Sequence, residues 1–225
     1  MPKIETFLLK GIKRIHNEIV WARLGIVTHL SYYRKHAKGC LMCPPLEGDF
    51  CDLATVTFNN DRVVEYQIRS LKLFFKYPFR YTVFDNSSND AAAKRIQGIC
   101  KKYQVGYIKL PPQVFLPKGF GSYSHGIAIN YAVNHYIKNG GARYFGLLDH
   151  DIFLIRDFDI SCHLDPHQFF YGCKHGFYIW PGLFFMTMTK IIKKGVDFRP
   201  SLHLRGDTGA CNYYHHFFHT KMFLL

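Results

Sequence analysis

The stretch GLLDHDIFLI, residues 146–155, places two aspartates, Asp149 and Asp151, between two apolar runs. A carboxylate is costly to bury unless it is paired with a cation or binds a metal. Residues two apart in an extended segment point the same way, so both carboxylates face one point if the strand continues through them. A hard cation such as Mn²⁺ or Mg²⁺ takes such carboxylates together with substrate phosphates. The stretch therefore predicts a metal site at a strand end, with two exposed turn aspartates as the alternative.

Strand-like and helix-like segments alternate around this stretch. β-rich runs are separated by segments with apolar residues at spacings of three or four. The alternation predicts an α/β domain over residues 51–225, with a mainly parallel sheet and helices on both faces. Ser87 and Asp90 have the spacing of a capping box. The predicted strands are 52–60, 80–90 with its polar turn, 105–110 and 142–155, and the predicted helices are 61–77, 92–103 and 122–141.

Polar residues follow three of the predicted strands. Parallel sheets bind ligands at the carboxyl ends of their strands, so these residues are expected to meet at one edge. The sequence after the first strand, TFNNDR, contains none of the glycine-rich motifs that hold phosphates, so a metal would have to take their place. The residues concerned are Asn59 and Asn60, Asp85 and Asn86, and Asp149 and Asp151.

The first 50 residues differ from the rest. Residues 1–35 carry apolar positions three or four apart among lysines and arginines, which predicts a basic amphipathic helix. Such a helix either packs on the main domain or lies on an anionic membrane. Residues 36–50, with glycine and proline punctuation, are interpreted as a linker. No signal peptide and no membrane-spanning segment are predicted.

Charge and cysteine content narrow the class of protein. The formal net charge of +13 indicates anionic partners, such as nucleotide phosphates, nucleic acid or a membrane surface. No nucleic-acid-binding motif is recognised, so nucleic acid is not an expected partner. Seven cysteines at irregular spacings favour reduced thiols and a cytoplasmic location. A zinc site would need a second matched pair, so it is only a minor alternative for His36, Cys40, Cys43 and Cys51.

Four segments together resemble the GT-A glycosyltransferases, most nearly the family 2-like group, over residues 52–210. They are ATVTFNN, YTVFDNSSND, SYSHGIAINYAV and LLDHDIFL. The resemblance implies the GT-A fold, a nucleotide-sugar donor and a Mn²⁺ or Mg²⁺ cofactor. It also implies that Asp151 binds the metal and that Asp149 contacts ribose or the metal. The nucleotide-binding residues implied in this way are Thr57, Asn59, Asp85, Ser124, His125 and Asp149.

This sequence departs from the family pattern in two places. Ser124 and His125 stand where many relatives have Arg-Asn, and the usual C-terminal Glu-Asp pair is absent. The nearest substitute is Asp207, beside Gly206 in the segment LRGDTGACNYY. An inverting transferase needs a carboxylate that takes the proton of the acceptor hydroxyl. Asp207 is predicted to be that base, with an ordinary turn aspartate as the alternative.

The expected function follows from this resemblance. The protein would transfer a sugar from a nucleotide diphosphate sugar, with UDP favoured, to a hydroxyl of a glycan, lipid-linked or protein acceptor. The family implies inversion and a role in cell-surface glycan or polysaccharide synthesis. Peripheral contact at the inner face of the membrane is possible through residues 1–35. An inactive nucleotide-sugar-binding relative and, after it, a nucleic-acid-binding protein are the alternatives.

Overall fold

The computed structural model describes residues 19–20, 23, 32–113, 121–164, 169–175, 178–189, 195–201 and 206–212. In these residues one seven-stranded sheet has the order β1-β4-β3-β2-β5-β7-β6. Strands β4, β3, β2 and β5 run parallel, and antiparallel pairs complete both edges. The strands are β1 (Lys38–Leu41), β2 (Cys51–Thr57), β3 (Phe79–Asp85), β4 (Gly106–Lys109), β5 (Tyr144–Leu148), β6 (Phe170–His175) and β7 (Tyr178–Thr187).

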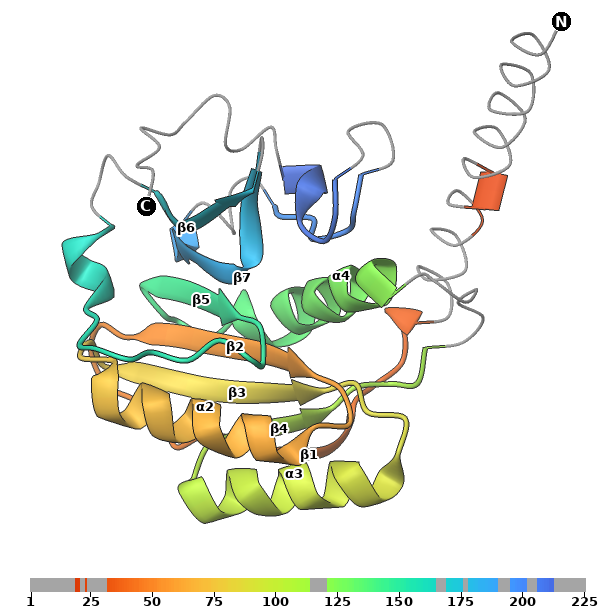
Figure 1. The fold of residues 1–225 in the computed structure, drawn as a ribbon, viewed down its shortest axis with the longest axis horizontal. Coiled ribbons are helices and arrows are strands. Elements are labelled where there is room, and N and C mark those ends of the chain that lie inside the picture. Colours follow the sequence, from red (N-terminus) through yellow and green to blue (C-terminus); the bar gives the residue numbers. More distant parts are fainter. Residues whose placement is uncertain are drawn as a thin grey trace, which may run out of the picture.

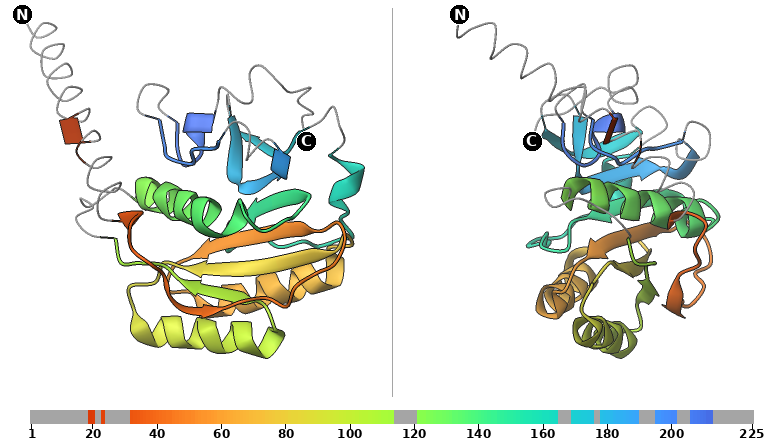
Figure 2. Two further views of the ribbon diagram at one scale, coloured as in Figure 1. Left: turned by 180° about the vertical axis from the view of Figure 1, so that it is seen from behind. Right: turned by 90° about the vertical axis from the view of Figure 1, so that its right-hand side faces the viewer.

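Helices cover both faces of this sheet (Figure 1). Helices α2 (Asp61–Phe74) and α3 (Asp90–Tyr103) lie on one face, and α4 (Gly121–Ala132) lies on the other. A π-helical turn, η2 (Val133–Ile137), continues α4, and two short 3-10 turns are η3 (Ile160–Cys162) and η4 (Ala210–Asn212). The views of Figure 2 show the same layers from behind and from the side. The predicted sheet with helices on both faces is therefore confirmed, with antiparallel strands added at its edges.

The core explains why these segments take these forms. Every residue of β2 is buried, as expected for a strand that is covered on both faces. Val64, Ile68 and Leu71 of α2 pack against one face of the sheet. The other face packs against α4, in which Ile127 and its neighbours are buried on all sides.

Three predicted boundaries are wrong. Residues 38–41, interpreted as linker, form β1 and pair with β4. The cap of α3 is Asn89 rather than Ser87, since the Asn89 side chain accepts a hydrogen bond from the amide of Ala92. The strand predicted over 142–155 ends at Leu148. Beyond it the chain turns back, and the amide of Ile152 donates to the carbonyl of Asp149.

Most of the helix predicted over residues 1–35 lies outside the described residues. The described positions Tyr32 to Lys35 form a turn that packs against α4 and η2. Within the described parts of the chain, no helix is long and apolar enough to cross a bilayer. Membrane contact through the first helix stays a prediction.

Candidate functional site

Asp149 and His125 meet where β5 ends beside α4. The amide of Asp149 donates to the carbonyl of Gly182 on β7, which holds the first residue after the strand in place (2.9 Å). The Asp149 carboxylate lies 3.5 Å from Nε2 of His125, and the two side chains are 20% and 26% exposed. Asp151 is exposed, two residues further along the turn. Since the segment is a turn, the two carboxylates are neighbours without the strand alternation that the sequence suggested.

The electrostatics of this corner are those of a crowded acidic site. Burial raises the pKa of Asp149 to about 6, and the negative charges of Asp151 and Asp207 add to the effect. Burial likewise lowers the pKa of His125 to about 4, helped by His150, so the imidazole is neutral at pH 7. A neutral His125 cannot neutralise the carboxylates. Since no described lysine or arginine pairs with Asp149 either, its charge is available to a cationic ligand.

Asp207 reaches the same corner from the C-terminal part of the chain. Its charge acts on both Asp149 and His125. The amide of Asp207 donates to the hydroxyl of Tyr178 (3.1 Å), and its carboxylate accepts from the amide of Thr208 (2.7 Å). The Asp207 side chain is exposed. The structure thus brings together the three aspartates that the sequence singled out.

Helix α2 holds the turn that carries Asp149 and Asp151. Gln67 is fully buried, and its side-chain amide donates to the carbonyls of Asp149 (2.6 Å) and Ile152 (2.8 Å). Its oxygen accepts from the hydroxyl of Tyr81 (2.5 Å). One turn further on, the Ser70 hydroxyl donates a hydrogen bond to the carbonyl of Leu154 and accepts one from the amide of the same residue. Sequence reasoning missed Gln67, although a polar residue inside the apolar stripe of a helix signals a buried partner.

Helix α4 holds the segment that carries Asp207. The side chain of Asn130 donates to Asp197 (2.8 Å) and accepts from the amide of Phe198 (2.8 Å). A Cβ at Gly126 would lie 2.9 Å from the Cα of Arg199 and closer still to the Phe198 carbonyl, so only glycine allows this approach. The Thr208 hydroxyl donates to the carbonyl of Ser122 at the start of α4. The two acidic segments are therefore held by helices on opposite faces of the sheet.

A pocket of about 970 Å³ opens beside this corner, at the carboxyl ends of β2, β3 and β4. Ser124 lines the pocket, and the next residue of α4, His125, lies 3.5 Å from Asp149. Asp149, Asp151 and Asp207 are not themselves among the lining residues. The walls combine basic, polar, aromatic and proline side chains. The lining residues are Arg34, Lys35, His36, Phe58, Asn86, Ser87, Ser88, Asp90, Lys109, Leu110, Pro111, Pro112, Gln113 and Ser124. Most of these residues were not among the predicted site residues.

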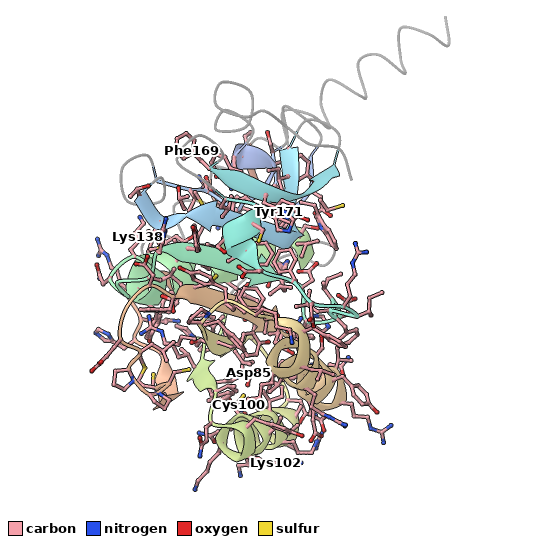
Figure 3. The ribbon with its side chains drawn as sticks, turned by 90° about the vertical axis from the view of Figure 1, so that its left-hand side faces the viewer. Asp85, Cys100, Lys102, Lys138, Phe169 and Tyr171 are labelled. Carbon is pink, nitrogen blue, oxygen red and sulfur yellow. The ribbon has the colours of Figure 1, made fainter. Side chains whose placement is uncertain are left out.

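Asp85 is in a different position from the one a base-binding carboxylate would need. It has no exposed surface, and Figure 3 shows it in the interior near Cys100. Its oxygens accept from the hydroxyl of Tyr107 and the amide of Ser87 (both 2.8 Å), and Lys109 lies 3.4 Å away. A nucleotide could contact Asp85 only if these partners were exchanged. The predicted contact stays a prediction, and the visible role of Asp85 is to join the ends of β3 and β4.

The other predicted nucleotide contacts lie around the same edge. Asn59 has a left-handed backbone (φ 55°) and bonds Ser87, Ser88 and Asn89, so it fastens the end of β2 to the loop after β3. The hydroxyl of Thr57 is buried without a hydrogen-bond partner among the described residues. Among the residues predicted to bind the nucleotide, Ser124 is the one that lines the described pocket.

The fit of a metal ion rests on Asp149 and Asp151. Both offer carboxylate oxygens, and the raised pKa of Asp149 marks negative charge that a cation would relieve. In the described residues, no three His, Cys, Asp or Glu side chains are arranged to hold a metal by themselves. An ion here would therefore need phosphate oxygens as further ligands. Cys40 and Cys43 instead contact Tyr136 and the carbonyl of Tyr81.

Comparisons with known proteins show a likeness in structure. The sequence matches no family model and no curated protein. A mannosyltransferase from Pyrobaculum calidifontis, PcManGT, solved with GDP-Man and Mn²⁺, superposes with a TM-score of 0.50 at 11% identity, over 84% of this chain and 57% of that one.

Two further structures align less closely. A fragment of TarS from S. aureus gives a TM-score of 0.41 at 13% identity, over 67% of this chain and 50% of that one. An active-site mutant of LgtC gives a TM-score of 0.42 at 15% identity, over 63% of this chain and 59% of that one. This chain thus spans between half and three fifths of each structure's length. From the sheet order, the helix placement and the first of these superpositions, the chain has the fold of the GT-A-type glycosyltransferases.

Proposed function

We propose that the protein is a metal-dependent glycosyltransferase that moves a sugar from a nucleotide diphosphate sugar to an acceptor hydroxyl. The observation that carries the proposal is the meeting of Asp149, Asp151 and Asp207 beside a large pocket, at the carboxyl edge of a GT-A-type sheet. Ligands of parallel α/β sheets bind at this edge. UDP is the first donor nucleotide to test, followed by GDP.

The pocket suits the nucleoside part of such a donor. Phe58 is 53% exposed and offers an aromatic face to a base. Asn86 and Gln113 also line the pocket, where their side-chain amides bond each other and Ser124, the residue before His125. The diphosphate would then lie next to Asp149 and Asp151. These residues would hold a Mn²⁺ or Mg²⁺ ion, which supplies positive charge to a diphosphate leaving group.

Asp207 is suited to activate the acceptor. In the proposed reaction the acceptor oxygen attacks the anomeric carbon, and its proton passes to the Asp207 carboxylate. The bond between that carbon and the phosphate oxygen breaks, and its electron pair leaves with the nucleoside diphosphate. A single displacement of this kind inverts the anomeric carbon. Asp207 is oriented for this role by two hydrogen bonds: its amide donates to the Tyr178 hydroxyl, and its carboxylate accepts from the Thr208 amide.

The proposal is tested by calorimetric titration with UDP, GDP and CDP, each with Mn²⁺ and with a chelator. Wild-type protein is expected to bind one nucleotide in a metal-dependent manner, and Asp151→Ala is expected to abolish the metal dependence. Asp157→Ala is the matched control, because Asp157 is an exposed aspartate that pairs with Lys76 further along the same segment. If no nucleotide binds under any condition, the proposal fails.

Turnover separates a transferase from an inactive nucleotide-sugar-binding relative. Release of nucleoside diphosphate from the matching sugar donor is measured with wild-type protein and with Asp207→Asn. Release that is lost in the variant supports catalysis, whereas tight binding without release favours the binding protein. A glycan, lipid-linked or protein acceptor, cell-surface glycan synthesis and membrane contact stay predictions.

A further inference from the structure

The turn formed by residues 32–36 is firmly attached to the domain. Tyr32 is buried and packs edge to face on Tyr131, with ring centres 5.3 Å apart. The Tyr131 hydroxyl donates to the carbonyl of Lys35 (2.6 Å), and His135 Nε2 lies 3.1 Å from the carbonyl of Tyr33. Figures 1 and 2 show the chain passing beside α4 at this point. The backbone of the turn is therefore fixed, while its basic side chains are left for other contacts.

Those side chains form one wall of the pocket. Arg34, Lys35 and His36 all line it, and Arg34 and His36 are exposed. Neither Arg34 nor Lys35 forms an ion pair with another described residue. Lys109, the other lysine of the pocket, bonds the carbonyl of Ser87 and pairs with Asp85. Within the part of the chain that the structure describes, the positive charge of Arg34 and Lys35 in this wall is therefore not neutralised by an ion pair.

Among the residues that line the pocket, acidic side chains are few, and the aspartates of the turn after β5 lie outside its lining. Asp90, at the start of α3, is the one acidic residue that lines it. Unpaired cations that face a cavity favour an anion inside it, and the field of a partly enclosed cavity is screened less than that of an open surface. Arginine and lysine are also the side chains that bind phosphate oxygens most strongly.

We propose that Arg34 and Lys35 bind the phosphate groups of the nucleotide, so that residues preceding the first parallel strand complete the donor site. The inference rests on the proposed function and assigns new contacts to it. The domain contributes carboxylates near the phosphates, which repel them without a metal. The positive charges of Arg34 and Lys35 in the turn attract the phosphates. Affinity should consequently depend on the number of phosphates and on the charge of this wall.

The test is a titration series with UDP, UMP and uridine and with GDP, GMP and guanosine, at low salt in the presence of Mn²⁺. Relative to wild type, Arg34→Ala with Lys35→Ala is expected to bind the diphosphate about tenfold or more weakly. The loss should be smaller for the monophosphate and absent for the nucleoside. Anchoring of the turn uses the Lys35 backbone, so the substitutions leave the anchor in place.

Two controls keep the test specific. Lys94→Ala with Lys101→Ala removes the same charge from exposed positions of α3 that do not line the pocket, and it should leave affinity within about twofold. Arg34→Lys with Lys35→Arg keeps the charge and should retain most of the affinity.

The outcomes distinguish the two proposals. If wild type binds nucleotides and the Arg34/Lys35 variant binds the diphosphate equally well, this inference is overturned and the proposed function stands. An equal loss for nucleoside and diphosphate also overturns it, because packing rather than charge would then be responsible. A wild-type protein that binds no nucleotide overturns both.

Discussion

The two segments that supply the acidic side chains differ in how their charges are satisfied. In the turn after β5, Asp149 has a pKa raised to about 6 by burial and by the charge of Asp151, and no described lysine or arginine pairs with it. In the segment beside α4, Asp197 has a lowered pKa. Burial opposes this shift, but hydrogen bonds from Arg199 and Asn130 outweigh it. The turn after β5 thus holds a buried carboxylate, Asp149, that no described lysine or arginine pairs. The segment beside α4 pairs its buried carboxylate, Asp197, with Arg199.

This difference assigns separate tasks to the two segments. A turn with unbalanced carboxylates is suited to bind a cation together with a phosphate. A segment that carries its own ion pair is suited to hold one carboxylate, that of Asp207, at a fixed place. Substitutions in the first segment should therefore change nucleotide binding, and substitutions in the second should change turnover.

The largest expected effect separates these tasks directly. Asp207→Asn removes the proton acceptor, and kcat for sugar transfer should fall about 10²- to 10⁴-fold. The metal-dependent affinity for the nucleotide should change by less than about threefold, since Asp207 would contact the acceptor side. Titration and product release are measured on the same preparation. Loss of nucleotide affinity to the same extent would show that the two segments act as one binding site.

The next effect comes from releasing the first segment from α2. Gln67→Leu leaves the half-buried carbonyls of Asp149 and Ile152 and the buried Tyr81 hydroxyl without this partner, which should lower the free energy of unfolding by about 3 kcal/mol. Nucleotide affinity in Mn²⁺ should fall as well, because the turn with Asp149 loses its support. Urea unfolding and calorimetry measure the two effects.

Ser70 provides the matched control for Gln67. Ser70→Ala removes two hydrogen bonds to Leu154, further along the same segment, and leaves the bonds to Asp149 and Ile152 intact. It should cost stability while changing nucleotide affinity much less. Equal losses of affinity in Gln67→Leu and Ser70→Ala would show that Gln67 acts through general stability alone.

A third variant releases the second segment from α4. Asn130→Ala removes the donor to Asp197 and the acceptor for the Phe198 amide, which should lower the free energy of unfolding by about 2 kcal/mol. The value of kcat should fall and nucleotide affinity should hold, the reverse of the pattern for Gln67→Leu. Unchanged kcat in the folded variant would argue against a positioning role.

The smallest expected effect is a pH dependence of the free energy of unfolding that comes from Asp197. Because the folded-state pKa of Asp197 is lowered, its contribution is fully present above its unfolded pKa, near 3.8, and is lost as pH falls through the lower folded value. The stability gap between wild type and Asp197→Asn should therefore shrink as pH drops below about 4. Urea unfolding at a series of pH values measures this gap, and a gap that stays constant would contradict the ion pair.

The α/β fold and the position of Asp149 and Asp151 after a strand could be predicted from the sequence for physical reasons. The spacing of Val64, Ile68 and Leu71 marks a helix with one buried face, and that face is observed. Asp149 and Asp151 stand out because charge after a fully apolar strand is unusual. The assumption that the strand continues through them was wrong. The chain turns there, and the Gln67 side chain donates hydrogen bonds to the carbonyls of Asp149 and Ile152 in that turn.

The parts that were missed depend on contacts between distant residues. The pocket wall at Arg34 and Lys35 exists because Tyr32 packs on Tyr131, about a hundred residues later in the chain. No periodicity or short motif records such a contact. The same limit applies to Asp85, which the family pattern assigns to the nucleotide although Tyr107 and Ser87 engage both of its oxygens.

If the proposed function holds, the burial of Asp85 has a consequence for changing the nucleotide-sugar donor. A carboxylate that joins two strands is a poor position for a mutant library, because most replacements would remove the hydrogen bond from Tyr107 and the ion pair with Lys109. Variation at the pocket surface, at Asn86, Ser88 and Gln113, alters the walls without breaking that junction. Selection for a new base should begin at these three positions, which line the pocket and do not bond the Asp85 carboxylate.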